Sequence, residues 1–150
     1  MSTAYSMGSG VPGLVAKEYG KLADYTFNFA NIAAGTSLLG ANDASQNTVM
    51  TSASGDTYKF PVPLNAEVQV YYQVVTANTD GGGARTVSIG DSANSSTYWV
   101  SALDMTTAGN LTKSSGGPYL YAAAADNVIV LNNEALSSGS LRVVVYAKII

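Results

Sequence analysis

The stretch EVQVYYQVV, residues 67–75, alternates between apolar and polar side chains with a period of two. One set runs from Val68 to Val74 and is β-branched or aromatic, whereas the other set runs from Glu67 to Gln73 and is mostly polar. Successive side chains of a strand point to opposite faces, so this pattern predicts a β-strand with one buried face. β-Branched and aromatic residues are also the types that pack best on a pleated surface.

The same period of two recurs on both sides of this stretch. DYTFNFANI (24–32) alternates Phe27 and Phe29 with polar residues, and KFPVPL (59–64) alternates apolar residues with two prolines. Since Pro61 and Pro63 cannot donate to a ladder, the second segment is predicted at a sheet edge or at the entrance of a strand. Further strands are predicted in RTVSIG (85–90), TYWVS (97–101), LTK (111–113), YLYAA (119–123) and NVIVLN (127–132).

The last segment, LRVVVYAKII (141–150), is apolar on both of its alternating sides. This is typical of a central strand or of one covered on both faces. About eight strands separated by Gly, Asn and Ser turns predict an all-β fold, an antiparallel β-sandwich. The long gap between the first two strong strands favours a Greek-key or jelly-roll path, and one helical turn is expected at ALDM (102–105).

Residues 1–24 differ in character from the rest of the chain. MSTAYSMGSGVPG (1–13) is rich in glycine and is predicted to be an extended N-terminal arm. LVAKEYGKLAD (14–24) places Val15, Tyr19 and Leu22 on one side of a short helix, although Gly20 weakens it by about 1 kcal/mol relative to Ala. We therefore expect an arm with a short helix at 1–24 and one jelly-roll domain at 25–150, with no second domain.

The sequence contains no histidine and no cysteine. A strand that ends in Gly90-Asp91-Ser92 resembles the way one class of esterases presents its serine, but a serine without a base is a weak nucleophile. A lysine such as Lys59 or Lys113 is a conceivable base, yet no spacing supports it. We interpret this segment as a turn, and we expect no enzymatic activity and no catalytic residue.

Two further patterns that point to ligands are weak. Gly8-Ser9-Gly10-Val11-Pro12-Gly13 matches the dinucleotide fingerprint, but no strand precedes it and Pro12 removes a backbone donor. No D-x-D-x-D-G calcium loop occurs, so any metal site would have to be built from separate loops. We expect no cofactor and no metal site.

Charged residues make up only 11% of the 150 residues, and the net charge is −3. This balance is a poor match for nucleic acid, since phosphate contacts by Lys and Arg dominate that affinity. No apolar run approaches the ~20 residues that span a bilayer, and the N-terminus lacks the features of a secretory signal. We expect a protein made in the cytoplasm that packs against other protein.

The order of segments from Phe60 onward resembles a known family. FPVPLNAEVQVYYQVVT is followed by a glycine turn, then by RTVSIGDSANSSTYWVSALDMTTAG, GGPYLYAAAADNVIVL and LSSGSLRVVVYAKII. This pattern is similar to the jelly-roll structural proteins of tailed bacteriophages, especially head decoration (cement) proteins and related head-fibre modules. It covers about the last ninety residues and none of the chain before Phe60.

The resemblance implies a virion protein that binds the outside of a phage capsid and stabilises it, often as a homotrimer. The implied partners are the major capsid protein and further copies of this chain, on a capsid assembled in the host cytoplasm. The interface residues expected in the arm are the apolar groups that the sandwich core explains least, namely Val11, Pro12, Leu14, Tyr19 and Leu22. A mobile arm of this kind would become ordered on binding.

An alternative function is a receptor- or carbohydrate-binding β-sandwich module of a phage fibre or spike. Ten tyrosines and Trp99 are the side chains that would form a sugar-binding platform. The same side chains also serve cores and protein interfaces, and for a sandwich of low charge we favour packing.

Overall fold

The computed structural model describes residues 18–29, 54–55, 57–83, 85–122 and 127–150. Nine β-strands and no α-helix occur in these ranges, which confirms the all-β prediction. The strands are β1 (Gly20–Asn28), β2 (Thr57–Pro61), β3 (Ala66–Thr76), β4 (Thr86–Asp91), β5 (Val100–Asp104), β6 (Thr112–Lys113), β7 (Tyr119–Tyr121), β8 (Asn127–Asn132) and β9 (Ser140–Ile149).

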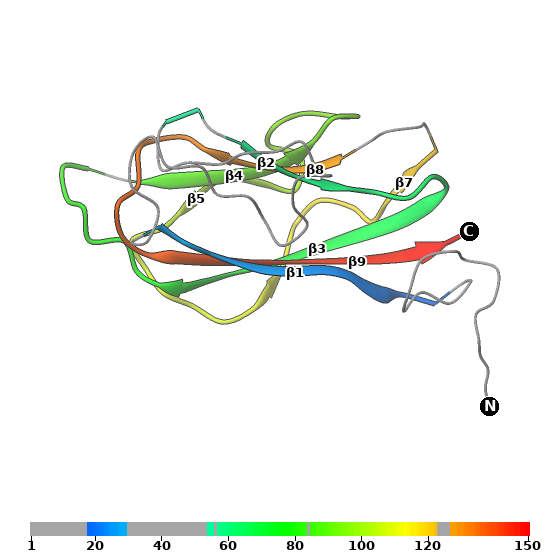
Figure 1. The fold of residues 1–150 in the computed structure, drawn as a ribbon, viewed down its shortest axis with the longest axis horizontal. Coiled ribbons are helices and arrows are strands. Elements are labelled where there is room, and N and C mark those ends of the chain that lie inside the picture. The colour runs from blue at the N-terminus through cyan, green and yellow to red at the C-terminus, as the bar shows by residue number, and fades with distance from the viewer. Residues whose placement is uncertain (1–17, 30–53, 56, 84, 123–126) are drawn as a thin grey trace.

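The strands form two antiparallel sheets that pack face to face (Figure 1). One sheet has the order β1-β9-β3-β6, with β7 also paired to β3, and the other has the order β2-β8-β4-β5. If β6 and β7 are taken as two parts of one strand, each sheet has four strands. Consecutive strands then alternate between the sheets except for β4 and β5, which are neighbours in one sheet, and this is the path of a jelly roll. The predicted β-sandwich is confirmed.

The alternating residues of the sequence form the core between the sheets. Phe27, Phe29, Val68, Val70 and Ile89 are buried there, as their spacing predicts. The last strand, β9, lies between β1 and β3, which confirms its central position.

The predicted edge strand is also confirmed, because β2 lies at the edge of its sheet and ends at Pro61. Phe60 and Val62 are buried as expected, but Leu64 is 53% exposed. It lies in the turn after β2, where the period of two no longer applies.

Two local predictions of helix are wrong within the described residues. Gly20–Asp24 belongs to β1, because a ladder with β9 from Gly20 to Asn28 provides the hydrogen bonds that a short helix would have made. Residues 102–104 of ALDM belong to β5, where the N–H of Ala102 donates to Ser88 Oγ at 3.0 Å. In both cases pairing with a distant strand overrides a weak local preference.

Candidate functional site

The outer face of the β1-β9-β3 sheet carries more aromatic and apolar side chains than a solvated sheet face needs. Tyr71 of β3 and Tyr146 of β9 lie on this face, opposite to the core residues of the same strands. Val144, which is directly opposite Tyr71 in the ladder and two residues before Tyr146, is fully buried although it is not part of the core cluster. Antiparallel sheets commonly leave such a face polar and wet, so this face is the candidate interaction surface.

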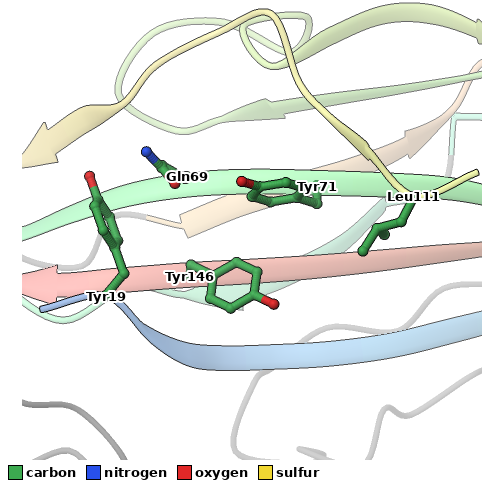
Figure 2. Close-up of a pocket in the computed structure, with 5 residues that line it drawn as sticks. All are labelled: Tyr19, Gln69, Tyr71, Leu111 and Tyr146. Atoms are coloured by element: carbon green, nitrogen blue, oxygen red, sulfur yellow. The ribbon is translucent and has the colours of Figure 1, made fainter.

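A shallow groove of about 330 Å³ follows the strands across this face. Figure 2 shows its lining side chains, from Tyr19 at one end, past Gln69, Tyr71 and Tyr146, to Leu111 at the other. The rings of Tyr71 and Tyr146 meet edge to face, with centroids 5.4 Å apart and planes at 77°. We call these five residues the tyrosine groove.

Local structure explains why these side chains meet. In the antiparallel ladder, Tyr71 is opposite Val144 and Gln69 is opposite Tyr146, so the two tyrosines are diagonal neighbours on one face. Leu111 reaches the groove because β6 pairs Thr112 with Tyr72. Leu111 is 39% exposed, and Leu120 on the same face, opposite Glu67, is 44% exposed.

A charged cluster fixes the Tyr19 end of the groove. The hydroxyl of Tyr19 donates a short hydrogen bond to Glu67 Oε2, and Lys148 Nζ lies 4.7 Å from the centre of the Tyr19 ring. Lys148 Nζ also lies 3.9 Å from Glu67 Oε2. Burial, the hydrogen bond to Glu67 and the charge of Glu67 together raise the pKa of Tyr19 to about 12, so this hydroxyl keeps its proton at neutral pH.

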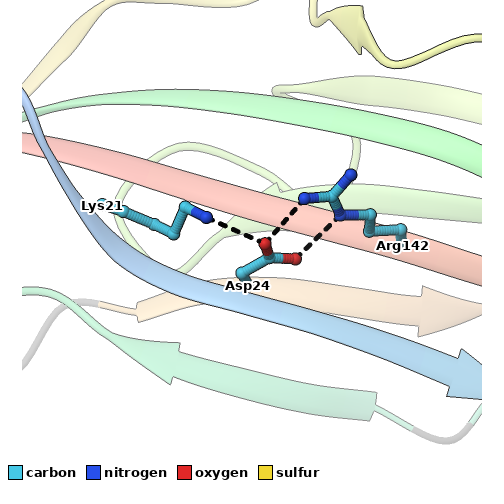
Figure 3. A network of polar contacts seen from close by, with 3 residues as sticks. All are labelled: Lys21, Asp24 and Arg142. Carbon is cyan, nitrogen blue, oxygen red and sulfur yellow. Dashed lines mark hydrogen bonds and ion pairs between the residues drawn. The ribbon is translucent and has the colours of Figure 1, made fainter.

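A second charged cluster lies on the same face, on β1 and β9 (Figure 3). Arg142 donates to both oxygens of Asp24, from Nε at 2.9 Å and from a terminal nitrogen at 2.7 Å. Lys21 Nζ lies 3.1 Å from the same carboxylate. The hydrogen bonds from Arg142 are the main cause that lowers the pKa of Asp24 to about 2.

The expected interface residues fall into three groups. Tyr19 is half-buried and lines the groove, outside the core. Leu22 packs against the core, whereas it was expected to be an apolar side chain that the core does not explain. Val11, Pro12 and Leu14 lie outside the described residues, as does the segment that matches the dinucleotide fingerprint.

Sequence reasoning did not select Tyr71, Tyr146 or Leu111 as site residues. A signal was present, because the alternation in the strands already places Tyr71 and Tyr146 on the side away from the buried valines. Aromatic residues are enriched at protein interfaces, so two outward tyrosines on neighbouring strands are the signal that could have indicated this surface.

The turn expected at Gly90-Asp91-Ser92 begins only at Ser92, because Gly90 and Asp91 are the last two residues of β4 and pair with β8. Asp91 at the end of β4 is buried, and its carboxylate accepts hydrogen bonds from the backbone and side chain of Asn94 and from the hydroxyl of Tyr121. Ser92 Oγ accepts the N–H of Asn127 at 2.9 Å. A side chain at Gly90 would place its Cβ 2.1 Å from the carbonyl oxygen of Ser95, so the loop packs directly on that glycine.

Trp99 does not belong to any surface platform. It is only 1% exposed and packs in the core, with its ring against Gly117. The preference for packing over sugar binding is therefore confirmed for Trp99.

Within the described ranges, no group of three or more His, Cys, Asp or Glu side chains lies close enough to hold a metal ion. The described residues also contain no helix with the length and apolar character that a membrane span requires.

No protein-family model matches the chain. No curated protein matches it either. A solved structure described as the capsid of Ralstonia phage GP4 is similar, with a TM-score of 0.59 and 15% sequence identity over 90% of this chain and 86% of that chain. At this identity the likeness establishes a shared fold.

Proposed function

We propose that this chain is a structural protein of a tailed-phage virion that binds the outer surface of the capsid and stabilises it, as decoration proteins do. The observation that carries the proposal is the tyrosine groove on the outer face of a jelly-roll sandwich. Tyrosine is enriched in protein interfaces because its ring contributes a large contact area. The fold shared with the capsid structure of Ralstonia phage GP4 supports the same role.

The edge strands of the sheets have features that disfavour pairing with another chain, so a partner is expected to bind a sheet face instead. Among the described residues β1 pairs only with β9, yet it carries a bulge between Lys21 and Ala23 and two charged residues on the outer face. β2, at the edge of the other sheet, ends in Pro61. Bulges, charges and prolines are devices that prevent edge strands from pairing with other chains. The outer face of the β1-β9-β3 sheet, which carries the tyrosine groove, is the surface that we assign to a partner.

The partners in this proposal are the major capsid protein and further copies of this chain, arranged as a homotrimer on the capsid surface. Contacts repeated over many sites of a shell brace it even where each single contact is weak. Tyr19 contributes to the capsid contact from the groove. Val11, Pro12 and Leu14 stay part of the proposed interface through the N-terminal arm, and Leu22 supports the strand from which Tyr19 extends. The protein has a binding role and no enzymatic one.

Co-sedimentation with purified capsids of the parent phage tests this function. Tyr71→Ala and Tyr146→Ala should each weaken capsid binding by roughly tenfold or more, as expected for central aromatic contacts. Thr26→Ala is the matched control, because Thr26 is exposed on the same sheet outside the groove. Light scattering should show a trimer.

Wild-type protein that stays monomeric and does not bind capsids at any concentration would refute the proposed function. Undiminished capsid binding by both tyrosine variants would instead remove the groove from the interface.

A further inference from the structure

We propose that the tyrosine groove receives an extended, proline-containing segment in the polyproline II conformation. This inference rests on the proposed function, since it names the chemistry of the capsid segment that the groove would bind. Grooves lined with aromatic side chains are a recurring means of binding such segments, because the polyproline II helix is already ordered before it binds.

The length of the groove fits a short segment of this kind. Tyr19 lies at the level of Glu67, to which it is hydrogen-bonded, and Leu111 lies near Gln73, because the next residue pairs with Tyr72. From Glu67 to Gln73 the strand covers about 20 Å at ~3.4 Å per residue. A polyproline II helix, which rises ~3.1 Å per residue, would need about six or seven residues to span it.

The hydrogen-bonding groups of the groove also fit. The side-chain amide of Gln69 and the hydroxyls of Tyr71 and Tyr146 line the groove, and none of these three groups has a hydrogen-bond partner among the residues that the structure describes. All three can donate. A polyproline II segment makes no internal hydrogen bonds, so its carbonyl oxygens need such donors when they leave water.

The electrostatics of the groove point to an uncharged ligand. Among the described residues no charged side chain lines it, and the charged side chains beside it are paired with each other, Glu67 with Lys148 and Asp24 with Arg142. An acidic or basic segment would lose hydration there without gaining a partner. Proline side chains are uncharged and need no such partner.

A neutral saccharide is the rival ligand, and the groove fits it less well. A sugar ring carries a hydroxyl on most of its carbons, and each buried hydroxyl requires a partner. Among the described residues the groove supplies Gln69, Tyr71 and Tyr146 as polar side chains without a partner, while the Tyr19 hydroxyl already donates to Glu67. Proline rings need apolar contact instead, which tyrosine rings and Leu111 provide.

The experiment titrates the full-length protein with a synthetic oligoproline of about seven residues, the length that the groove accommodates. A Gly-Ser peptide of equal length is the control peptide, and binding is measured by calorimetry and by amide chemical shifts in NMR. The oligoproline should bind saturably, and Tyr71→Ala should weaken its binding roughly tenfold or more. Thr26→Ala should bind like wild type, and urea unfolding should show that both variants are folded.

Each other result has a defined meaning. Equal binding of the Gly-Ser peptide, or absence of oligoproline binding, would overturn the inference. Binding of a glycan-array saccharide that Tyr71→Ala abolishes would overturn it in favour of a sugar site. Loss of capsid binding in Tyr71→Ala without any oligoproline binding would refute this ligand while the proposed function stands. Oligoproline binding by a protein without capsid affinity would support the ligand and refute that function.

Discussion

Replacing Tyr121 by phenylalanine removes one oxygen from the interior of the sandwich. Tyr121 is fully buried on β7, and its hydroxyl donates to Asp91 Oδ2 at the end of β4. The same oxygen accepts the side-chain amide of Asn94 at 2.9 Å, and Oδ1 accepts the N–H of Asn94 at 2.5 Å. The variant therefore leaves a buried carboxylate with one donor fewer.

The size of the effect follows from that missing donor. A hydrogen bond to a charged group contributes ~1.5–3 kcal/mol, and the ring itself stays in place. We expect Tyr121→Phe to lower the free energy of unfolding by about 2 kcal/mol. For a domain of this size the melting temperature then falls by roughly 4–8 °C.

Urea unfolding followed by the fluorescence of Trp99, which is buried beside Tyr121, measures the change. The midpoint should fall with an unchanged m-value, because the same surface is exposed on unfolding. Tyr119→Phe is the control, since its hydroxyl has no hydrogen-bond partner in the part of the chain that the structure describes. A double-mutant cycle with Asp91→Asn isolates the interaction between the two side chains. A loss below about 0.5 kcal/mol, or one equal to that of Tyr119→Phe, would refute the reasoning.

Three further predictions concern other parts of the fold. Gly117→Ala should destabilise the protein by about 3 kcal/mol or more, because the new Cβ would lie 2.2 Å from the Trp99 ring on a residue whose φ is +68°. Gly109→Ala is the control and should not change stability in the same urea assay, because a Cβ at Gly109 would have no atom within 4 Å. Asp80→Ala should lower the free energy of unfolding by about 1–2 kcal/mol at neutral pH, because the Asp80 carboxylate joins the β3–β4 loop to the β8–β9 loop. Partial burial opposes ionisation of this carboxyl, but hydrogen bonds from the β8–β9 loop lower its pKa. The difference in stability between wild type and variant should therefore disappear as the pH falls below 3.8. An equal acid response in both proteins would contradict this. Because the pKa of Tyr19 is raised from 10.0 to about 12, the contribution of the Tyr19 hydroxyl to stability should be present below pH 10 and lost as the pH rises toward 12. In thermal melts at a series of pH values, Tyr19→Phe should therefore lose less stability between pH 10 and pH 12 than wild type does.

Much of the fold could be read from the spacing of residues along the chain. The alternation from Val68 to Val74 and the pair Phe27 and Phe29 predicted both the strands and their buried faces. The prolines of KFPVPL predicted a sheet edge. These features are local, and the pleat of a strand fixes which side chains share a face.

The candidate site was only partly predictable, because it depends on contacts between distant segments. Tyr19 was expected to lie outside the core, but on a helix, and Leu22 was expected beside it rather than against the core. The spacing of β1 contains no information on its partner, and it is the ladder with β9 that makes this segment a strand. Strand propensity depends strongly on such context.

The sequence alone determined that the chain forms an antiparallel sandwich and which side of each strand is apolar, because both follow from a period that neighbouring residues set. Only the tertiary structure decided that β9 lies between β1 and β3. That order brings Tyr19, Tyr71 and Tyr146 into one groove, and the sandwich takes Trp99 into the core instead of the surface. Strand order depends on pairing between residues far apart in the chain. The entropy of closing the loops between them, and the packing that compensates it, cannot be read from a local pattern.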